Sequence, residues 1–290
     1  MNMNDTAVAI GTFDGLHRGH RSLLQSLQVI ARRRHLRSVV VALERPVRAV
    51  PGVLATVEEK QELLTQFSLD EVIIVPVDDA LIKQSAITFL NDFLSETLHA
   101  RHIVVGRNFS FGHARHGTVD WLRDNGKDLG IQLSVVAPVC YHRAVISSSR
   151  IRTLLLRGRV SYANKLLGRL YSFEGMPERG RGVGRTLGFP TINLATAPGK
   201  IIPRGVYLCC ASQGGLWLPG VINIGTRPTF NIAETIVPEL HLLDFSGVWE
   251  DKPTRVYLMK HIRNEIRFKN KAELMNQLAA DVLAARHFFR

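Results

Sequence analysis

The sequence predicts two domains: an α/β domain built on a parallel sheet, then a small antiparallel β-barrel or sandwich with a C-terminal helix. The chain has 290 residues, which is long for a single domain. Up to about residue 168, short β-branched runs alternate with helical patterns, as in βαβ units. Beyond that point, glycine and proline separate short apolar runs, which is typical of an antiparallel barrel. We therefore predict domains over residues 1–168 and 169–290.

Apolar runs in the first half are the expected strands. Their near-continuous apolar character suits strands that are covered on both faces. They occupy residues 8–10, 38–43, 71–77, 102–106 and 132–139. Between them, one predicted helix covers residues 85–98, and another carries an apolar stripe made of Leu23, Leu24, Leu27, Ile30 and Ala31. Ligands of such sheets bind beyond the carboxyl ends of the strands, which is where this sequence places its glycines.

The second half has shorter apolar runs, separated by glycine and proline. Its expected strands occupy residues 205–211, 215–225, 239–245 and 254–259. A closing helix is predicted over residues 270–286, where Leu274, Leu278 and Val282 fall on one face that should pack on the barrel. Residues 158–171 predict a last helix and a short linker between the two halves.

Composition and charge narrow the class of protein. Hydrophobic residues make up 46% of the chain and charged residues 21%, which argues against a disordered protein. The net charge is +12, from 37 basic and 25 acidic residues, and a basic surface concentrates anions. The densest basic run, residues 31–37, is interpreted as a solvated helix end rather than a nucleic-acid patch.

Cysteine usage and the N-terminus bear on the compartment. Cys140, Cys209 and Cys210 have no CxxC spacing, and we expect buried thiols in a reducing compartment. The first residues lack the pattern of a signal peptide, and no apolar run approaches the ~18 residues that span a bilayer. We therefore expect a cytoplasmic protein with no membrane partner.

The segment GTFDGLHRGH, residues 11–20, joins the first predicted strand to the first predicted helix. Glycines at a helix start let a phosphate approach backbone N–H groups at the positive end of the helix dipole. Two imidazoles on that first turn can donate hydrogen bonds to phosphate oxygens. A zinc site and a simple capped helix with surface histidines are the alternatives, and the zinc site lacks a third ligand nearby. We predict a phosphate site that contains Gly11, Phe13, Asp14, Gly15, His17 and His20.

Two further segments of the first half bear chemistry. ISSSRIR, residues 146–152, offers hydroxyls that can cap a helix or grip phosphate, with an arginine that adds charge. Its predicted phosphate ligands are Ser147, Ser148, Ser149 and Arg150, although a plain N-cap is the more common role of such serines. The loop VGRNFSFGHARHG, which ends at Gly117, brings Asn108 and two phenylalanines to a strand end. Such a loop suits a planar heterocycle, and buried phenylalanines are the default alternative.

Motifs of the second half suggest another phosphate site. GRGVGRTLGFPTINL, residues 180–194, joins a glycine-rich basic loop to two hard oxygen ligands, Thr191 and Asn193, which share a face if the segment is a strand. A flexible hairpin with a basic tip is the alternative, and the pattern is not a P-loop. In PELHLLDF, residues 238–245, Glu239 is either a surface residue or a general base for a hydroxyl nucleophile.

Taken together, GTFDGLHRGH, VGRNFSFG and ISSSRIR resemble the adenylyltransferase half of bacterial bifunctional riboflavin kinase/FAD synthetases. The resemblance implies a nucleotidyltransferase-like fold and transfer of AMP from ATP to FMN, with release of pyrophosphate. His17 and His20 would steady the α-phosphate, Asn108 would lie by the flavin, and residues 147–150 would hold phosphates. The family usually carries an aromatic-x-Pro-His-Pro segment after the second strand. This chain has LERPVRAVP there, which keeps Pro46 and lacks the histidine and the aromatic residue.

The second half, from GFPTINL to the closing helix, resembles the riboflavin kinase domain. The resemblance implies that Glu239 activates the ribityl 5′-hydroxyl of riboflavin to attack the γ-phosphate of ATP. Thr191 and Asn193 would bind Mg²⁺, and the glycine loop with Gly182, Gly184 and Arg185 would cover the phosphates. In SGVWEDK this chain departs from the Tyr-Gly that the family more often has, and Trp249 offers the aromatic wall.

The leading hypothesis is therefore a cytoplasmic flavin-cofactor enzyme with riboflavin, FMN, FAD and ATP as its small-molecule partners. One alternative is a riboflavin kinase with a degenerate first domain. The other is a basic nucleic-acid-binding or regulatory protein, which the absence of interleaved aromatic and basic strand residues disfavours. The sequence leaves the oligomeric state open.

Overall fold

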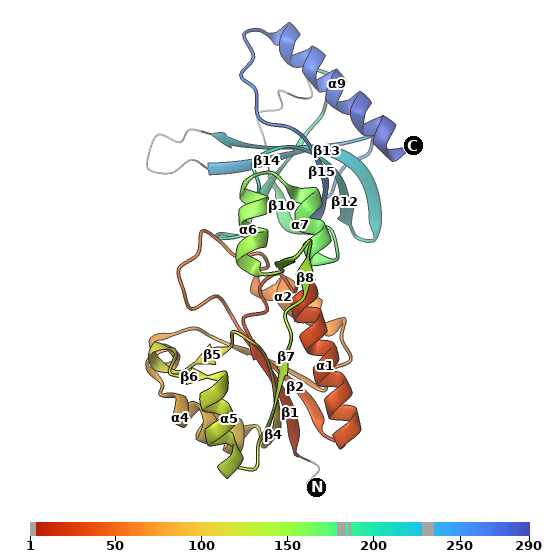
Figure 1. Cartoon of the computed structure of the whole chain (residues 1–290). Coiled ribbons are helices and arrows are strands. Elements are labelled where there is room, and N and C mark those ends of the chain that lie inside the picture. Colours follow the sequence, from red (N-terminus) through yellow and green to blue (C-terminus); the bar gives the residue numbers. More distant parts are fainter. Residues whose placement is uncertain (1–3, 179–183, 185–186, 228–234) are drawn as a thin grey trace. The chain divides into compact units, whose positions relative to one another are not determined.

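The computed structural model describes residues 4–178, 184, 187–227 and 235–290, and it divides the chain into two compact units, Met1–Ser148 and Ser149–Arg290. Figure 1 shows the elements of both units along the chain. Within the described residues, no helix combines the length and the apolar character that crossing a bilayer requires.

The first unit contains a parallel five-stranded sheet in the order β3-β2-β1-β4-β7. Its strands are β1 (Thr6–Gly11), β2 (Arg37–Leu43), β3 (Glu71–Val75), β4 (Ala100–Gly106) and β7 (Gln132–Val136). All five predicted strands are thus confirmed. The chain builds outward from β1 through β2 to β3 and then returns to β4 on the other side of β1. The carboxyl ends of β1 and β4 therefore flank the topological switch point, where open α/β sheets bind ligands.

Helices cover both faces of this sheet (Figure 1). The helices of this unit are α1 (Arg18–Arg34), α2 (Val57–Thr65), α3 (Asp79–Lys83), α4 (Ala86–Thr88), the π-helical η1 (Phe89–Thr97), the short η2 (His113–Arg115) and α5 (Val119–Asp128). Of these, α1 packs on one face of the sheet, and η1 and α5 pack on the other. Alternate residues of β1 point to opposite faces: Ala7 and Ala9 pack with Leu24 and Leu27 of α1, whereas Val8 packs with η1 and α5. The helix predicted over residues 85–98 is present as α4 and η1, and most of it has π rather than α winding.

Two short hairpins complete the first unit. They pair β5 (Ser110–Phe111) with β6 (Gly117–Thr118), and β8 (Cys140–Tyr141) with β9 (Ala144–Val145).

All three cysteines are free. The prediction of buried thiols is right for Cys209 and wrong for Cys140, which is exposed because it lies on the two-stranded β8–β9 hairpin, outside the main sheet. The arginines at residues 32–34 form the exposed last turn of α1, as interpreted from the sequence.

The second unit is a closed antiparallel barrel with strand order β10-β11-β14-β13-β12-β15, which confirms the predicted barrel. Its strands are β10 (Tyr171–Glu178), β11 (Ile192–Thr196), β12 (Gly205–Gln213), β13 (Leu216–Arg227), β14 (Thr235–Leu242) and β15 (Thr254–Arg263). Its helices are α6 (Ser148–Leu156), which starts at the last residue of the first unit, α7 (Val160–Leu167) and α9 (Lys271–Phe289).

The closing helix α9 packs on the outside of the barrel, as predicted. Ala285 is fully buried with Val206, Leu208 and Val221, and Val282 packs against the same cluster. Asp281, which is 4% exposed, accepts hydrogen bonds from both Nε and Nη2 of Arg263 on β15. Apolar contact and a bidentate ion pair therefore fix the helix to β12, β13 and β15.

Candidate active site

The glycine turn that follows β1 lies at the switch point of the sheet. Gly11 ends β1 beside Ala42 of β2, and α1 begins at Arg18. Gly15 has a φ of 76°, and a Cβ on it would lie 2.8 Å from the Cβ of Leu54. Both the left-handed backbone and the approach of the 54 segment therefore require glycine here. The turn presents the start of α1, with its positive dipole end, at the edge where parallel sheets bind ligands.

Asp14 is predicted to contact phosphate, but its side chain is buried and binds backbone N–H groups of another segment; the residue is 1% exposed. Its Oδ1 accepts hydrogen bonds from the backbone N–H groups of Leu54 (2.8 Å) and Ala55 (3.1 Å). The Asp14 carbonyl in turn accepts a hydrogen bond from Ser148 Oγ at 2.9 Å. The structure thus brings the glycine turn and the ISSSR segment together, although they are 134 residues apart in the chain. Asp14 is the residue that connects them.

His17 and His20 stack on one another at the start of α1. Their ring centroids are 3.7 Å apart and their planes differ by 14°. His17 is the N-cap of α1, because its Nδ1 accepts a hydrogen bond from the backbone N–H of His20 at 3.3 Å. An imidazole that accepts at Nδ1 carries its proton on Nε2, so His17 has one donor left for a ligand. The buried Phe13, also predicted for this site, meets the His20 ring edge-on at 5.3 Å and packs behind it.

Both imidazoles are neutral near pH 7. Burial lowers the pKa of His17 to about 4. The pKa of His20 lies well below its usual value because of burial first, and then because of the neighbouring His17 and Lys60. Nδ1 of His20 is buried and has no hydrogen-bond partner among the described residues. The pair is therefore suited to give hydrogen bonds to an anion, and it brings no positive charge of its own.

The segment LERPVRAVP, residues 43–51, in which this chain departs from the family pattern, is held at its start and is followed closely by a second anchored stretch. On one side Arg45 Nη2 donates to the Val77 carbonyl at 2.7 Å, and Lys60 Nζ donates to the carbonyls of Leu43 and Glu44. On the other side Asp14 holds the backbone of Leu54 and Ala55. This loop therefore lacks the histidine and the aromatic residue of the family pattern, but hydrogen bonds still hold it beside the glycine turn.

Asn108 lies on the exposed turn that follows β4, where the Phe109 N–H donates to the Gly106 carbonyl at 3.0 Å. Because β4 pairs with β1 in parallel register, this turn starts on the same edge of the sheet as the glycine turn. Phe109 and Phe111 stack with ring centroids 5.5 Å apart, and Phe111 meets Trp121 edge-on. The predicted aromatic loop is therefore a packed platform with an exposed amide at its start.

Ser149 and Arg150 are the first residues of the second unit. Ser149 accepts a hydrogen bond at its backbone carbonyl from Thr153 Oγ1 within α6. Arg150 Nη2 donates to the Tyr162 hydroxyl at 2.9 Å, and its guanidinium lies over the Tyr162 ring. Stacking and hydrogen bonding hold this guanidinium in a defined orientation.

The barrel places Asn193, Glu239 and Asn223 in one row across three neighbouring strands. Asn193 of β11 is paired with Glu239 of β14, and Glu239 is paired with Asn223 of β13. The neighbouring residues Leu240 and Ile222 are fully buried, so the polar row occupies the other, outer face of these strands. Side chains directly opposite each other in such pairs lie about 5 Å apart. A carboxylate is therefore flanked by an amide on each side.

Thr191 precedes β11 and is exposed, whereas Asn193 is 6% exposed. The Thr191 hydroxyl oxygen lies 3.0 Å from where a Cβ on Gly184 would stand, so glycine leaves this oxygen open. The preceding Pro190 carbonyl accepts a hydrogen bond from His241 Nδ1 at 2.8 Å, which fixes the segment against β14. The hydroxyl of Thr191 and the amide oxygen of Asn193 are hard oxygen donors of the kind that Mg²⁺ prefers. Gly182 and Arg185, also predicted for this site, lie outside the described residues.

Comparison with known proteins connects both halves of the chain to one family. The model of the FAD synthetase family matches residues 1–150, and the model of the riboflavin kinase family matches residues 167–289. The bifunctional riboflavin kinase/FMN adenylyltransferase of Escherichia coli (strain K12) is 36% identical over 290 residues, covering 97% of this chain and 92% of the relative. The chain belongs to the bifunctional riboflavin kinase/FMN adenylyltransferase family.

Further relatives extend the likeness. The family member of Haemophilus influenzae is 32% identical over 290 residues, covering 98% of this chain and 94% of the relative. A crystal structure titled as a macrolide-efflux protein from Streptococcus pneumoniae shares the fold, with a TM-score of 0.88 and 27% identity. That match covers 97% of this chain and 94% of the solved one.

Two residues that the structure places beside the candidate sites were missed from the sequence. Asn223 lies within a quoted apolar run, and only the strand register shows that it faces Glu239. Lys60 belongs to an ordinary-looking helix start, TVEEK, and no local pattern signals that its side chain is 1% exposed. The capping box of Thr56 and Glu59 was the readable signal in that segment, and it marks a helix start only.

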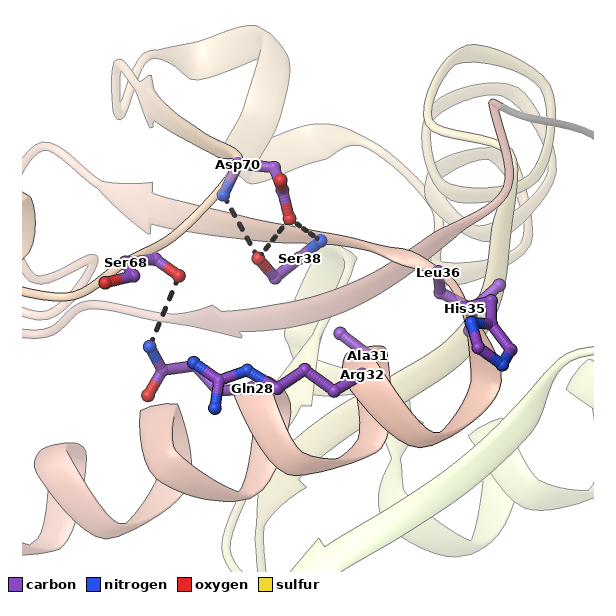
Figure 2. Close-up of a pocket in the computed structure, with 8 residues that line it drawn as sticks. All are labelled: Gln28, Ala31, Arg32, His35, Leu36, Ser38, Ser68 and Asp70. Atoms are coloured by element: carbon purple, nitrogen blue, oxygen red, sulfur yellow. Dashed lines mark hydrogen bonds between the residues drawn. The ribbon is translucent and has the colours of Figure 1, made fainter.

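A hollow of about 430 Å³ lies at the opposite, amino-terminal edge of the sheet (Figure 2). It is lined by Gln28, Ala31, Arg32, His35, Leu36, Ser38, Ser68 and Asp70. Asp70 accepts hydrogen bonds from the Ser38 hydroxyl and backbone N–H, which lower its pKa. None of the predicted site residues lines this hollow, and its acidic group is already bound by Ser38.

Proposed function

We propose that this chain makes both flavin cofactors: it phosphorylates riboflavin to FMN and adenylylates FMN to FAD, using ATP in both steps. The observation that carries the proposal is that one family model covers each half, with FAD synthetase over residues 1–150 and riboflavin kinase over residues 167–289. The full-length likeness to the bifunctional enzyme of Escherichia coli supports assigning both reactions to one chain.

In the first half, the glycine turn and the start of α1 would bind the phosphates of ATP. The N–H groups at the helix start and the donor on His17 Nε2 suit the charge that develops on the transferring phosphoryl group. His20, Gly11, Gly15, Ser147, Ser148, Ser149 and Arg150 are the other proposed phosphate ligands, and Asn108 is proposed to contact the flavin. A phosphate oxygen of FMN attacks the α-phosphorus of ATP, and pyrophosphate leaves.

Two proposed residues of that half take on supporting roles. Asp14 is bonded to backbone N–H groups, and its negative charge would repel a phosphate at short range. Phe13 is buried behind His20. We therefore assign both to shaping the turn, while the backbone around them faces the nucleotide.

In the second half, Glu239 would act as the general base. It would take the proton of the ribityl 5′-hydroxyl as that oxygen attacks the γ-phosphorus of ATP, and ADP leaves. Thr191 and Asn193 would hold Mg²⁺, which supplies neutralisation of phosphate charge when it is bound. Gly182, Gly184 and Arg185 are proposed to cover the phosphates.

The domain boundary and the compartment are part of the proposal. The riboflavin kinase match begins at residue 167, which supports a functional boundary at residues 168/169, although α6 and α7 group with the barrel by contact. Two ATP-dependent steps on soluble metabolites suit a cytoplasmic enzyme.

Labelled ATP tests the proposal. The pure chain is incubated with riboflavin, Mg²⁺ and ATP labelled at either the α- or the γ-phosphate, and the flavins are then separated. We expect γ-label in FMN and α-label in FAD. Label in FMN alone would leave a riboflavin kinase with a degenerate first half, and no label in any flavin with intact substrates and folded protein would refute both activities.

Two substitutions assign the activities to the halves. Glu239→Gln should abolish FMN formation and leave FAD formation from supplied FMN, and His20→Ala should do the reverse. Matched controls are Glu174→Gln, a carboxylate of β10 that is 45% exposed, and His287→Ala on the exposed side of α9. Loss of both activities from either site variant in a folded chain would contradict two separate sites.

A further inference from the structure

Lys60 is a buried lysine of α2 whose side chain reaches the carboxyl end of β2. Its side chain is 1% exposed, and its Nζ donates to the carbonyls of Leu43 and, at 3.0 Å, Glu44. It forms no ion pair with any residue in the described part of the chain. Burying an ammonium whose hydrogen bonds go only to carbonyls is costly, because a charge loses its hydration on burial.

The charged and titratable groups that face Lys60 come from three elements around the glycine turn. Asp14 of the turn and Glu44 of the β2 end attract its proton, and His20 of α1 is repelled by it. On its own helix, Glu59 is used in the capping box with Thr56. Burial outweighs the two carboxylates and lowers the pKa of Lys60 to about 8. The lysine is therefore charged at neutral pH, whereas the His20 imidazole on which it acts is neutral.

We propose that Lys60 is a positioning residue of the adenylyl-transfer site, whose buried ammonium fixes the end of β2 and supplies positive charge behind the neutral His20. This inference rests on the proposed function of the first half. The site must hold the phosphates of ATP, yet His17 and His20 contribute hydrogen bonds without charge. A cation fixed in a water-poor setting acts on a nearby anion more strongly than an exposed arginine does, because solvent screens it less.

The lysine charge also adds to the effects of burial and of His17, which keep His20 neutral. Protonating an imidazole beside a buried ammonium would place two like charges together, which lowers the imidazole pKa. Neutral imidazoles keep a defined tautomer, and the N-cap bond from the His20 N–H to His17 Nδ1 needs such a tautomer. Charge and hydrogen-bond donation are thus divided between the lysine and the histidines.

Variants of the full-length chain test this. Lys60→Met removes the charge and keeps the apolar stem, Lys60→Arg keeps a cation, and Lys83→Met is the matched control on an exposed lysine of α3. For each we would measure kcat and KM for ATP in FAD formation, FMN formation from riboflavin as an internal reference, and the His20 ring pKa by NMR titration.

We expect Lys60→Met to lower kcat/KM for ATP in FAD formation by at least about tenfold, less than the roughly 10²- to 10³-fold cost of removing a direct donor. FMN formation should not change, and the His20 pKa should rise. The rate of FAD formation by the wild-type chain should fall above about pH 8, because Lys60 then loses its proton. Lys60→Arg should be active, and its rate should not fall in this pH range, because arginine keeps its charge.

Several results would overturn the inference. An unchanged KM, kcat and His20 pKa in Lys60→Met, with only a lower melting temperature, would make the residue structural. If Lys60→Met does not fold, parallel pH profiles of wild-type and Lys60→Arg above pH 8 would refute the role. If the wild-type chain makes no FAD at all, the proposed function fails, and the NMR titration of His20 still decides whether the lysine charge acts on it.

Discussion

At the residue scale, His17 performs two tasks that depend on its being uncharged. Its Nδ1 closes the first turn of α1 by accepting from the His20 N–H, and its Nε2 proton is left for a ligand. A doubly protonated ring has no acceptor, so protonation would break the cap and place a charge in a site that is 5% exposed. The fold and the proposed phosphate site therefore require the same protonation state.

This requirement predicts acid sensitivity. The pKa of His17 is about 4 in the folded state and 6.5 when unfolded, so between these pH values the unfolded chain binds more protons. Stability present at pH 7 is therefore lost as pH falls from 6.5 towards 4, by up to about 3 kcal/mol. His17→Asn keeps an N-cap acceptor without a titrating group. Denaturant unfolding at several pH values should show a shallower loss in this variant between pH 6.5 and 4, and identical curves would contradict the assignment.

At the element scale, Asp14 determines where α2 begins relative to the sheet. Its carboxylate holds the N–H groups of Leu54 and Ala55, and Thr56 directly follows as the N-cap of α2. Lys60, one turn into α2, then reaches back to the end of β2. One buried carboxylate and one buried ammonium thus join β1, β2 and α2 around the glycine turn.

Removing the Asp14 carboxylate should destabilise the segment that precedes α2. Asp14→Ala leaves two buried N–H groups without this acceptor, each costing about 1–3 kcal/mol, so we expect a loss of about 2–6 kcal/mol in the first unit. Asp14→Asn retains an oxygen acceptor and should lose less. Urea unfolding measures the stabilities, and FMN formation serves as the control because it belongs to the other half. Equal stabilities of wild-type and Asp14→Ala would show that these bonds do not hold the segment.

The same elements show what sequence patterns predict and where they stop. Apolar runs bounded by glycines predict the strands, because strands buried on both faces of a parallel sheet need nearly continuous apolar sequence. They predict neither the π winding of η1 nor the order in which the strands pair around the barrel, because both depend on packing and register between distant residues. The glycine turn and the ISSSR segment are predicted as separate phosphate motifs, and their contact through Asp14 and Ser148 is a tertiary result. Lys60 and Asn223 carry no local signal at all, since burial and cross-strand pairing decide their roles.

At the scale of the whole molecule, each half has its own sheet and its own polar cluster. The parallel sheet carries the glycine turn, and the closed barrel carries the row of Asn193, Glu239 and Asn223. Both proposed reactions bind ATP and a flavin, and the products FMN and FAD are anions. The net charge of +12 therefore has an explanation in small-molecule chemistry, without a nucleic-acid partner.

Independence of the halves predicts complementation between inactive chains. Glu239→Gln should make no FMN and His20→Ala should make no FAD, so neither variant alone converts riboflavin to FAD. Mixed together with riboflavin and Mg-ATP, they should form FAD after a lag, because FMN released by the His20→Ala chain reaches the intact adenylyltransferase half of the other. Chromatography of the flavins over time measures the lag, which should shorten as the share of His20→Ala increases. FAD that fails to appear, while FMN stays bound to the His20→Ala chain, would mean that the intermediate is passed on only within one molecule.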